Sequence, residues 1–183
     1  MKENRRIMIR SKLLKESILE LMKNSSINKI SINDICENAD VNRTTFYNYY
    51  TDQYALLNEI EQDVLNKTTE FLSKLNEGNA ESVLLENFLE YVKKDREIFH
   101  TLLCDSGDNS FQIKLMDISM NRLKSDAFDS NISQVEEEYV YEFVLMGCLS
   151  MIKKWVINSF DKSPTELSKL LITLVNHGIS AFR

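Results

Sequence analysis

Residues 31–52 read SINDICENADVNRTTFYNYYTD, and this stretch decides the fold of the amino-terminal part of the chain. Ser31, with Asp34 three positions later, predicts the start of a short helix, because a serine hydroxyl and a nearby acid satisfy the first backbone amides of a helix. Asn42 predicts the start of another short helix in the same way. The two helices, expected at 31–38 and 42–49 with a tight turn between them, form a helix-turn-helix.

The second of these helices carries the side chains that reading DNA requires. Phe46 is expected to point inward, together with Val41 and Tyr50. The residues then expected to point outward are Arg43, Thr44, Thr45, Tyr47, Asn48 and Tyr49. Arginine can pair with guanine, asparagine with adenine and a threonine methyl with the thymine methyl, while tyrosine hydroxyls can hold phosphates. The alternative is that the tyrosines are ordinary residues at the rim of the core, with their hydroxyls in water.

The rest of the chain also has the composition of a helical protein. One proline and four glycines in 183 residues are too few for the turns of a β-rich fold. Apolar residues at helical spacing predict helices at about 4–23, 52–75, 80–93, 95–104, 109–125 and 134–160, and Pro164 opens a last one. We therefore expect an all-α chain, with a three-helix DNA-binding domain at 1–51 and a helical bundle at 52–183.

Charge and cysteine usage limit the class of protein further. Residues 1–50 carry nine Lys or Arg against six Asp or Glu, whereas residues 51–183 carry thirteen against twenty-two. A basic head on an acidic body favours a polyanionic partner for the head. No apolar run approaches the roughly 20 residues of a membrane span, and we find no signal peptide. Three widely spaced cysteines, Cys36, Cys104 and Cys148, favour free thiols in a reducing cytoplasm, so we expect a cytoplasmic protein with no membrane partner.

The segment SINDICENADVNRTTFYNYYTDQYALL (31–57) resembles the DNA-binding domain of the TetR family of bacterial transcriptional regulators. The resemblance covers about residues 5–57 and rests mainly on Thr45-Phe46-Tyr47, Tyr49-Tyr50 and Leu56-Leu57 at their spacing. Three positions depart from the family pattern. Asp40 replaces a common glycine, Cys36 replaces a common alanine, and Gln53 stands where a lysine often meets a phosphate. We expect the turn to survive, because Asp tolerates the left-handed backbone better than most residues.

Carried over by position, the resemblance implies the contacts with double-stranded DNA. Phosphate contacts fall on Ser31, Tyr47 and Tyr49, and base contacts on Arg43, Thr44, Thr45 and Asn48. Asn42 takes the place of the usual serine cap. The resemblance also implies a homodimer on a palindromic operator, because a two-fold axis would set two reading helices about one or more DNA turns apart. On the same ground we expect a repressor.

The resemblance implies that the bundle at 52–183 senses a small-molecule effector and dimerises. An apolar effector pocket is expected from Phe88, Tyr91, Phe99, Leu103, Met116, Met120, Phe143 and Met146, for which plain core packing is the alternative. The last two long helices are apolar on more than one side. Their candidate dimer residues are Met151, Trp155, Leu170 and Leu174, and packing within one chain is again the alternative.

Two other classes of protein compete with this interpretation. An enzyme would have to use His100 and Cys104, which lie one helical turn apart, but no acid–base pair or phosphate-binding loop accompanies them. Two ligands do not make a zinc site either, so we expect no catalytic residue, no metal and no cofactor. The other class is a helical protein-interaction module that lacks specific DNA binding, which Asp40 and Gln53 would support.

Overall fold

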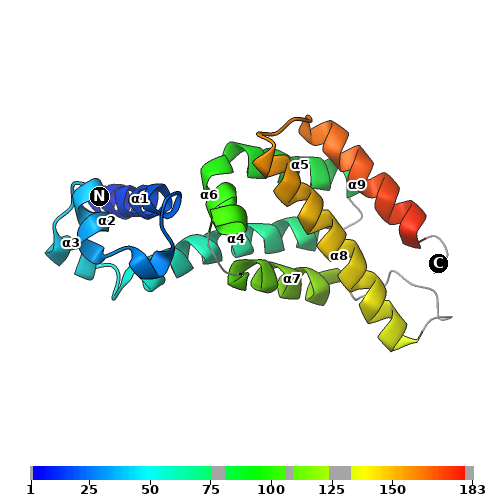
Figure 1. Ribbon diagram of the computed structural model, residues 1–183, viewed down its shortest axis with the longest axis horizontal. Helices are drawn as coiled ribbons and strands as arrows, with labels where there is room; N and C mark the ends of the chain where they lie inside the picture. Colours follow the sequence, from blue (N-terminus) through cyan, green and yellow to red (C-terminus); the bar gives the residue numbers. More distant parts are fainter. Residues whose placement is uncertain (1, 76–80, 106–108, 124–132, 180–183) are drawn as a thin grey trace.

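The structure, a computed structural model, describes all residues except 1, 76–80, 106–108, 124–132 and 180–183. Its described part is helical, with no β-strand, as expected (Figure 1). The helices are α1 (Lys2–Met22), η1 (Ile27–Lys29), α2 (Ile32–Asn38), α3 (Arg43–Tyr47), α4 (Gln53–Leu75), α5 (Glu81–Lys94), α6 (Arg96–His100), η2 (Thr101–Asp105), α7 (Ser110–Leu123), α8 (Gln134–Ile157) and α9 (Pro164–Ile179).

Helices α1 to α3 form a head at one end of the molecule, and α4 runs from this head into the body (Figure 1). The head closes around Leu14, Ile18, Ile35 and Phe46, which are completely buried. Removing these side chains from water is the main source of the head's stability, since short helices such as α2 and α3 are marginal alone.

The body packs α5 to α9 around the far part of α4. Its fully buried side chains include Leu89, Leu102 and Leu171, and they belong to the same continuous core as those of the head. The segment expected as one helix at 95–104 is instead the short α-helix α6 followed by a π-helical turn, η2. Gln112 of α7 donates a hydrogen bond to the Leu103 carbonyl in this turn, at 3.0 Å.

The carboxyl end of α8 is closed by a Schellman motif. The Phe160 amide donates to the Trp155 carbonyl at 2.9 Å, and Ser159 and Phe160 both have a positive φ. The Phe160 ring packs edge-on against Trp155, with 4.8 Å between ring centroids. Trp155 also donates from Nε1 to the Lys162 carbonyl. This closure turns the chain back so that Pro164 can open α9 at the first helical position.

Candidate nucleic-acid interface

Three local devices hold α3 in place. The Ser31 hydroxyl accepts from the Asp34 amide at 3.2 Å, and the Asp34 carboxylate accepts from the Ser31 amide at 2.9 Å, which is the expected capping box. Helix α2 ends in a Schellman motif in which Asp40 has a φ of 52°, so this aspartate does adopt the left-handed backbone. Asn42 then caps α3 by accepting from the Thr45 amide at 2.7 Å, as expected.

The outer side of α3 presents Arg43, Thr44, Tyr47 and Asn48 to solvent. Arg43 donates from Nη2 to the Tyr47 hydroxyl at 3.3 Å, and its guanidinium carbon lies 5.8 Å from the centroid of that ring. This pairing extends the Arg43 side chain along the surface of the helix. A guanidinium has five N–H donors, so the others remain available for a base edge or a phosphate.

Two of the residues expected to point outward do not do so. Thr45 is only 8% exposed, and Tyr49 is half-buried against the core. The reason is the geometry of a very short helix, in which positions 45, 46 and 49 share one face, so that Thr45 and Tyr49 follow Phe46 inward. The prediction of an outward Thr45 side chain is therefore wrong, and the exposed reading surface is narrower than the sequence implied.

Ser31 is exposed, but its hydroxyl also donates to the Asp34 carboxylate at 2.7 Å. These hydrogen bonds lower the pKa of Asp34, which stays ionised near neutral pH. The only basic residue on α3 is Arg43, and two acids lie close by, Glu37 on α2 and Asp40 in the turn. The helix-turn-helix by itself thus offers hydrogen-bonding groups for DNA but little positive charge.

A second candidate site is an apolar cavity of about 150 Å³ in the body, lined by α4, α5, α7 and α8 and partly open to solvent. Its lining is Thr68, Phe71, Leu72, Leu84, Leu85, Phe88, Leu115, Met116, Ser119, Leu145, Cys148, Leu149 and Ile152. Thr68 and Ser119 donate their hydroxyls to carbonyls of their own helices, those of Val64 and Leu115. Burial raises the pKa of the Cys148 thiol, which keeps it uncharged. The lining therefore offers shape and apolar contact, with no charged group.

The structure places the eight predicted pocket residues in three environments. Phe88 and Met116 line the cavity, whereas Tyr91, Phe99 and Leu103 pack beside it in an aromatic cluster and in the core. Met120 is half-buried on α7 outside the lining. Phe143 and Met146 were predicted wrongly as pocket residues, because they are 77% and 50% exposed on the outer side of α8. Phe71 and Leu149, which the prediction missed, follow the 3.6-residue period of their helices and could have been found by it.

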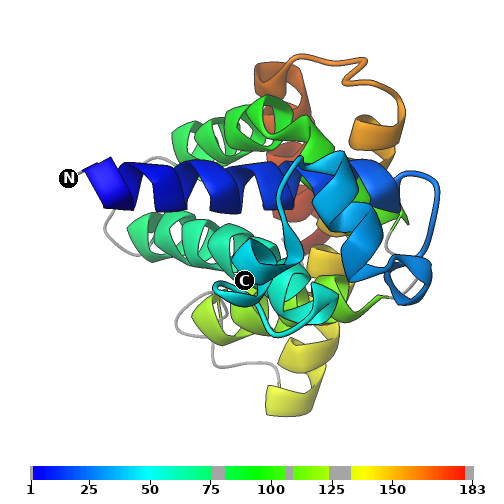
Figure 2. The same ribbon diagram turned by 90° about the vertical axis from the view of Figure 1, so that its left-hand side faces the viewer.

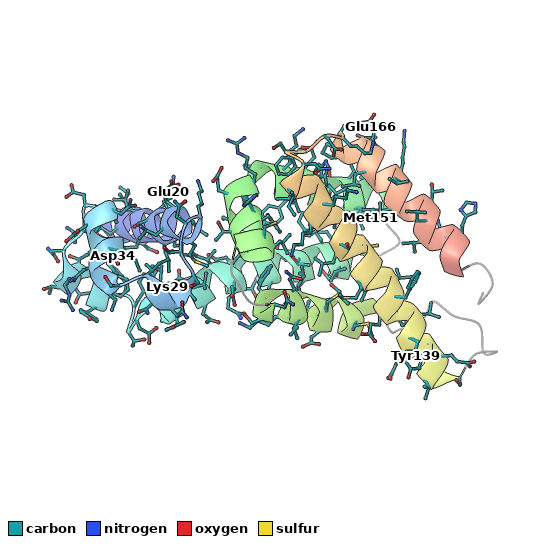
Figure 3. All side chains as sticks on the ribbon, in the orientation of Figure 1. Glu20, Lys29, Asp34, Tyr139, Met151 and Glu166 are labelled. Carbon is teal, nitrogen blue, oxygen red and sulfur yellow. The ribbon has the colours of Figure 1, made fainter. Side chains whose placement is uncertain are left out.

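The four predicted dimer residues also separate. Trp155 is only 2% exposed and Met151 is half-buried, so both pack within the chain. Leu170 and Leu174 are exposed on α9. Between residues 135 and 146 of α8, exposed apolar residues form an outer stripe with a spacing of three or four positions, Val135, Tyr139, Phe143 and Met146. Tyr139 projects from the end of α8 that lies far from the head, and Met151 lies nearer the other end of the helix (Figure 3). Helix α8 thus has one buried and one exposed apolar stripe, and the sequence pattern alone assigned them the wrong way round.

The two residues that an enzyme would have to use lie on successive helical segments of the body. His100 is exposed on α6, and Cys104 is half-buried in η2. Across the described residues, no group of three or more His, Cys, Asp or Glu side chains is arranged to hold a metal ion. None of the described helices combines the length and hydropathy that crossing a membrane requires.

Comparison with known proteins finds similarity over the C-terminal half of the chain and, at lower identity, over nearly its whole length. The family model for the C-terminal region of TetR transcriptional regulators matches residues 80–177. The HTH-type transcriptional activator of the dhaKLM operon of Lactococcus lactis, DhaS, is 22% identical over 178 residues, 91% of each chain.

Two solved structures share the fold over nearly the whole length. A TetR transcriptional regulator from Streptococcus agalactiae matches with a TM-score of 0.70 and 20% identity, over 96% of this chain and 98% of that one. The FadR repressor of Thermus thermophilus, solved in complex with lauroyl-CoA, matches with a TM-score of 0.57 and 17% identity, over 92% and 94%. At these identities the likeness concerns the fold.

Proposed function

This chain belongs to the TetR family of transcriptional regulators, and from that premise we propose that it is a homodimeric repressor whose α3 helix reads a palindromic operator. The observation that carries the proposal is the outer side of α3, where Arg43, Thr44, Tyr47 and Asn48 stand exposed on a helix fixed by the Asn42 cap. Arg43 and Asn48 are the base readers, and Tyr47 holds a phosphate and orients Arg43. Residues 1–51 are the DNA-binding domain and residues 52–183 the regulatory domain. Repression needs only that the dimer occupy its operator.

Selection of bound duplexes from a random library, at about 0.1–0.15 M salt, tests this function. We expect an inverted repeat to emerge. Arg43→Ala should weaken binding to that repeat by about 1–3 kcal/mol and relax the preference at one position of each half-site. If the folded wild-type protein enriches no sequence, the chain does not read DNA unaided, and the protein-interaction module becomes the better hypothesis.

The dimer would form through the outer stripe of α8 (Val135, Tyr139, Phe143 and Met146) and the exposed Leu170 and Leu174 of α9. A groove along α8, lined by Tyr139, Glu142, Phe143, Met146, Gly147 and Ser150, lies on this side. Gly147 has open space beyond it, so the backbone of a partner helix can approach closely there. Exposed apolar surface of this kind is stabilised by association, and a two-fold axis lets the same stripe cover itself.

Sedimentation equilibrium of Phe143→Asp tests this interface. We expect the variant to be monomeric and to lose affinity for the full inverted repeat, because each interface would bury an unpaired carboxylate. Ile113→Asp is the matched control, since Ile113 is also an exposed apolar residue but lies on α7. A dimeric Phe143→Asp protein would move the interface elsewhere.

The effector would be an uncharged apolar molecule bound in the cavity between α4 and α7. No side chain of the lining carries a charge that could neutralise a charged ligand, so we expect the cavity to select an uncharged one. Helix α4 lines the cavity with Thr68, Phe71 and Leu72 and continues into the head. An effector that favours one position of α4 therefore shifts the population between arrangements of the two heads.

A further inference from the structure

The positive charge of the head is concentrated in a segment that the helix-turn-helix does not include. Residues 1–13 contain five basic residues, Lys2, Arg5, Arg6, Arg10 and Lys12, against a single acid, Glu3. Residues 14–50 contain four basic and five acidic residues, so the rest of the head has a net charge of −1. The basic character of the head therefore comes from the first turns of α1 alone.

Two of the other basic residues of the head are already engaged within the protein. Lys15 lies 2.7 Å from the Asp63 carboxylate and 2.8 Å from that of Glu59. Lys23 lies 2.7 Å from Glu20 and 2.6 Å from Glu97. Among the basic residues from 14 to 50, this leaves Lys29 and Arg43. A DNA-binding head needs several phosphate contacts for useful affinity, and Arg43 has base edges to read.

The first turns of α1 extend beyond the packed head. Within residues 8–22, whose side chains the structure describes, the first fully buried residue is Leu14, and Met8, Ile9, Arg10 and Lys12 are exposed. From Lys2 to Ser11 the helix rises by about 14 Å. Figure 2, which faces the end of the molecule that carries α3, shows this part of α1 running across that end, with its amino terminus beyond the other helices.

The segment is also held in a fixed position relative to α3. The Ser11 hydroxyl and the Tyr50 hydroxyl are hydrogen-bonded at 2.8 Å. Tyr50 follows α3 directly, is buried, and packs its ring 5.8 Å from that of Phe46. A hydrogen bond therefore connects the point where α1 leaves the packed head to the segment that follows the reading helix.

We propose that residues 2–12 of α1 form a second DNA contact, which binds the phosphate backbone beside the groove occupied by α3. The length and charge of the segment fit this partner, because about 14 Å of duplex presents roughly eight phosphates. In this arrangement α3 contacts the bases, and the first turns of α1 provide the electrostatic attraction to phosphates that α3 lacks. The inference rests on the proposed function, since it assumes that α3 faces DNA.

The test is the salt dependence of DNA binding by an Arg5→Gln, Arg6→Gln, Arg10→Gln variant, on the selected operator and on an unrelated duplex of the same length. We expect the slope of log K against log salt to fall by about 2–3 per protomer, on both duplexes, since each lost phosphate contact removes about 0.9. Lys154→Gln, Lys162→Gln, Lys169→Gln is the matched control. It removes the same charge from exposed positions at α8 and α9, and its slope should stay that of the wild type.

Circular dichroism should show both variants folded, because Arg10 is exposed and glutamine is about as good a helix former as arginine. An unchanged slope in the arginine variant, or an equal fall in the control, would overturn the proposal. So would binding of phosphatidylserine vesicles that depends on the three arginines while DNA binding does not. Failure of the proposed function gives a different result. In that case Arg43→Ala would leave the sequence preference of the protein unchanged, while the salt slope on the unrelated duplex would still show whether the arginines of α1 contact phosphates.

Discussion

At the scale of single residues, Asn42 has more influence on the reading surface than its exposed position suggests. Helix α3 has only five residues, too few to be stable alone, and Asn42 satisfies the Thr45 amide at its start. We expect Asn42→Ala to lower the free energy of unfolding by about 1 kcal/mol, the usual cost of a lost cap, and to weaken operator binding as well. Urea unfolding and operator titration measure the two effects.

Asn42→Ser is the control for this prediction, because a serine hydroxyl can accept the same hydrogen bond. It should keep both the stability and the affinity of the wild type. Equal losses of operator affinity in the alanine and serine variants would mean that Asn42 contributes through a direct contact with DNA rather than through the cap.

Residues whose role depends on neighbours in sequence could be predicted, and those whose role depends on tertiary packing could not. Ser31, Asp40 and Asn42 act through backbone groups within a few positions, and the structure has them as expected. Thr45 and Trp155 were placed on the wrong side of their helices. Helical spacing tells which residues share a face, but which face meets the core depends on elements that are distant in sequence.

At the scale of helices, α2, α8 and α9 begin with the same arrangement of a serine and an acid three positions later. The pairs are Ser31 with Asp34, Ser133 with Glu136 and Ser163 with Glu166, and in each the acid accepts hydrogen bonds from the serine amide and hydroxyl. These bonds lower the pKa of all three carboxyls. Figure 3 shows Asp34 in the head and Glu166 at the start of α9, so the caps lie in both parts of the molecule.

This arrangement predicts a loss of stability in acid. A carboxyl with a lowered pKa stabilises the folded state above its pKa in the unfolded chain, about 4, and that stability is lost as the pH falls through the lower folded value. The urea midpoint should therefore drop below about pH 4.5. The drop should be shallower in an Asp34→Asn, Glu136→Gln, Glu166→Gln variant.

The control for the acid prediction replaces three exposed acids outside the caps, Glu37→Gln, Glu90→Gln and Asp117→Asn. It should retain the wild-type pH profile. If the control flattens the profile as much as the cap variant, overall charge rather than capping sets the acid sensitivity.

The existence and order of the helices could be predicted, whereas the π-helical turn at Thr101–Asp105 could not. Apolar spacing is nearly the same for an α-helix and a single π turn. The side chain of Gln112, from the next helix, donates a hydrogen bond to the Leu103 carbonyl within the turn. A contact from another helix of this kind has no signature in the sequence of the turn itself.

At the scale of the whole molecule, ion pairs connect the head and α4 to the helices of the body. Lys114 of α7 lies 2.6 Å from the buried carboxylate of Glu61 on α4, and Lys23, the first residue after α1, lies 2.6 Å from Glu97 of α6. Helices α4 and α7 also contribute to the lining of the cavity, with α7 doing so from Leu115, the residue after Lys114. We therefore predict that a ligand that changes the spacing of α4 and α7 also changes how α4 meets the head.

Filling the cavity tests this coupling. Benzene, which suits an apolar cavity of this size, should raise the melting temperature of the wild-type protein, because a ligand that binds only the folded state stabilises it. If the cavity is coupled to the heads, benzene should also change operator affinity, within the 5–150-fold range usual for allosteric coupling. Cys148→Phe places a ring in the cavity and should abolish both responses.

Ser119→Ala is the informative comparison, because the Ser119 hydroxyl already donates to the Leu115 carbonyl and should contribute nothing to an apolar ligand. This variant should respond to benzene as the wild type does. A melting temperature that rises while operator affinity stays constant would show that ligand binding in the cavity is not coupled to the head. The cavity would then bind ligands, but the contacts of α4 with α7 would be rigid supports and would transmit no signal to the head. Constant operator affinity in the wild type together with altered affinity in Cys148→Phe would instead show that the contacts do transmit, and that benzene is too small to move them.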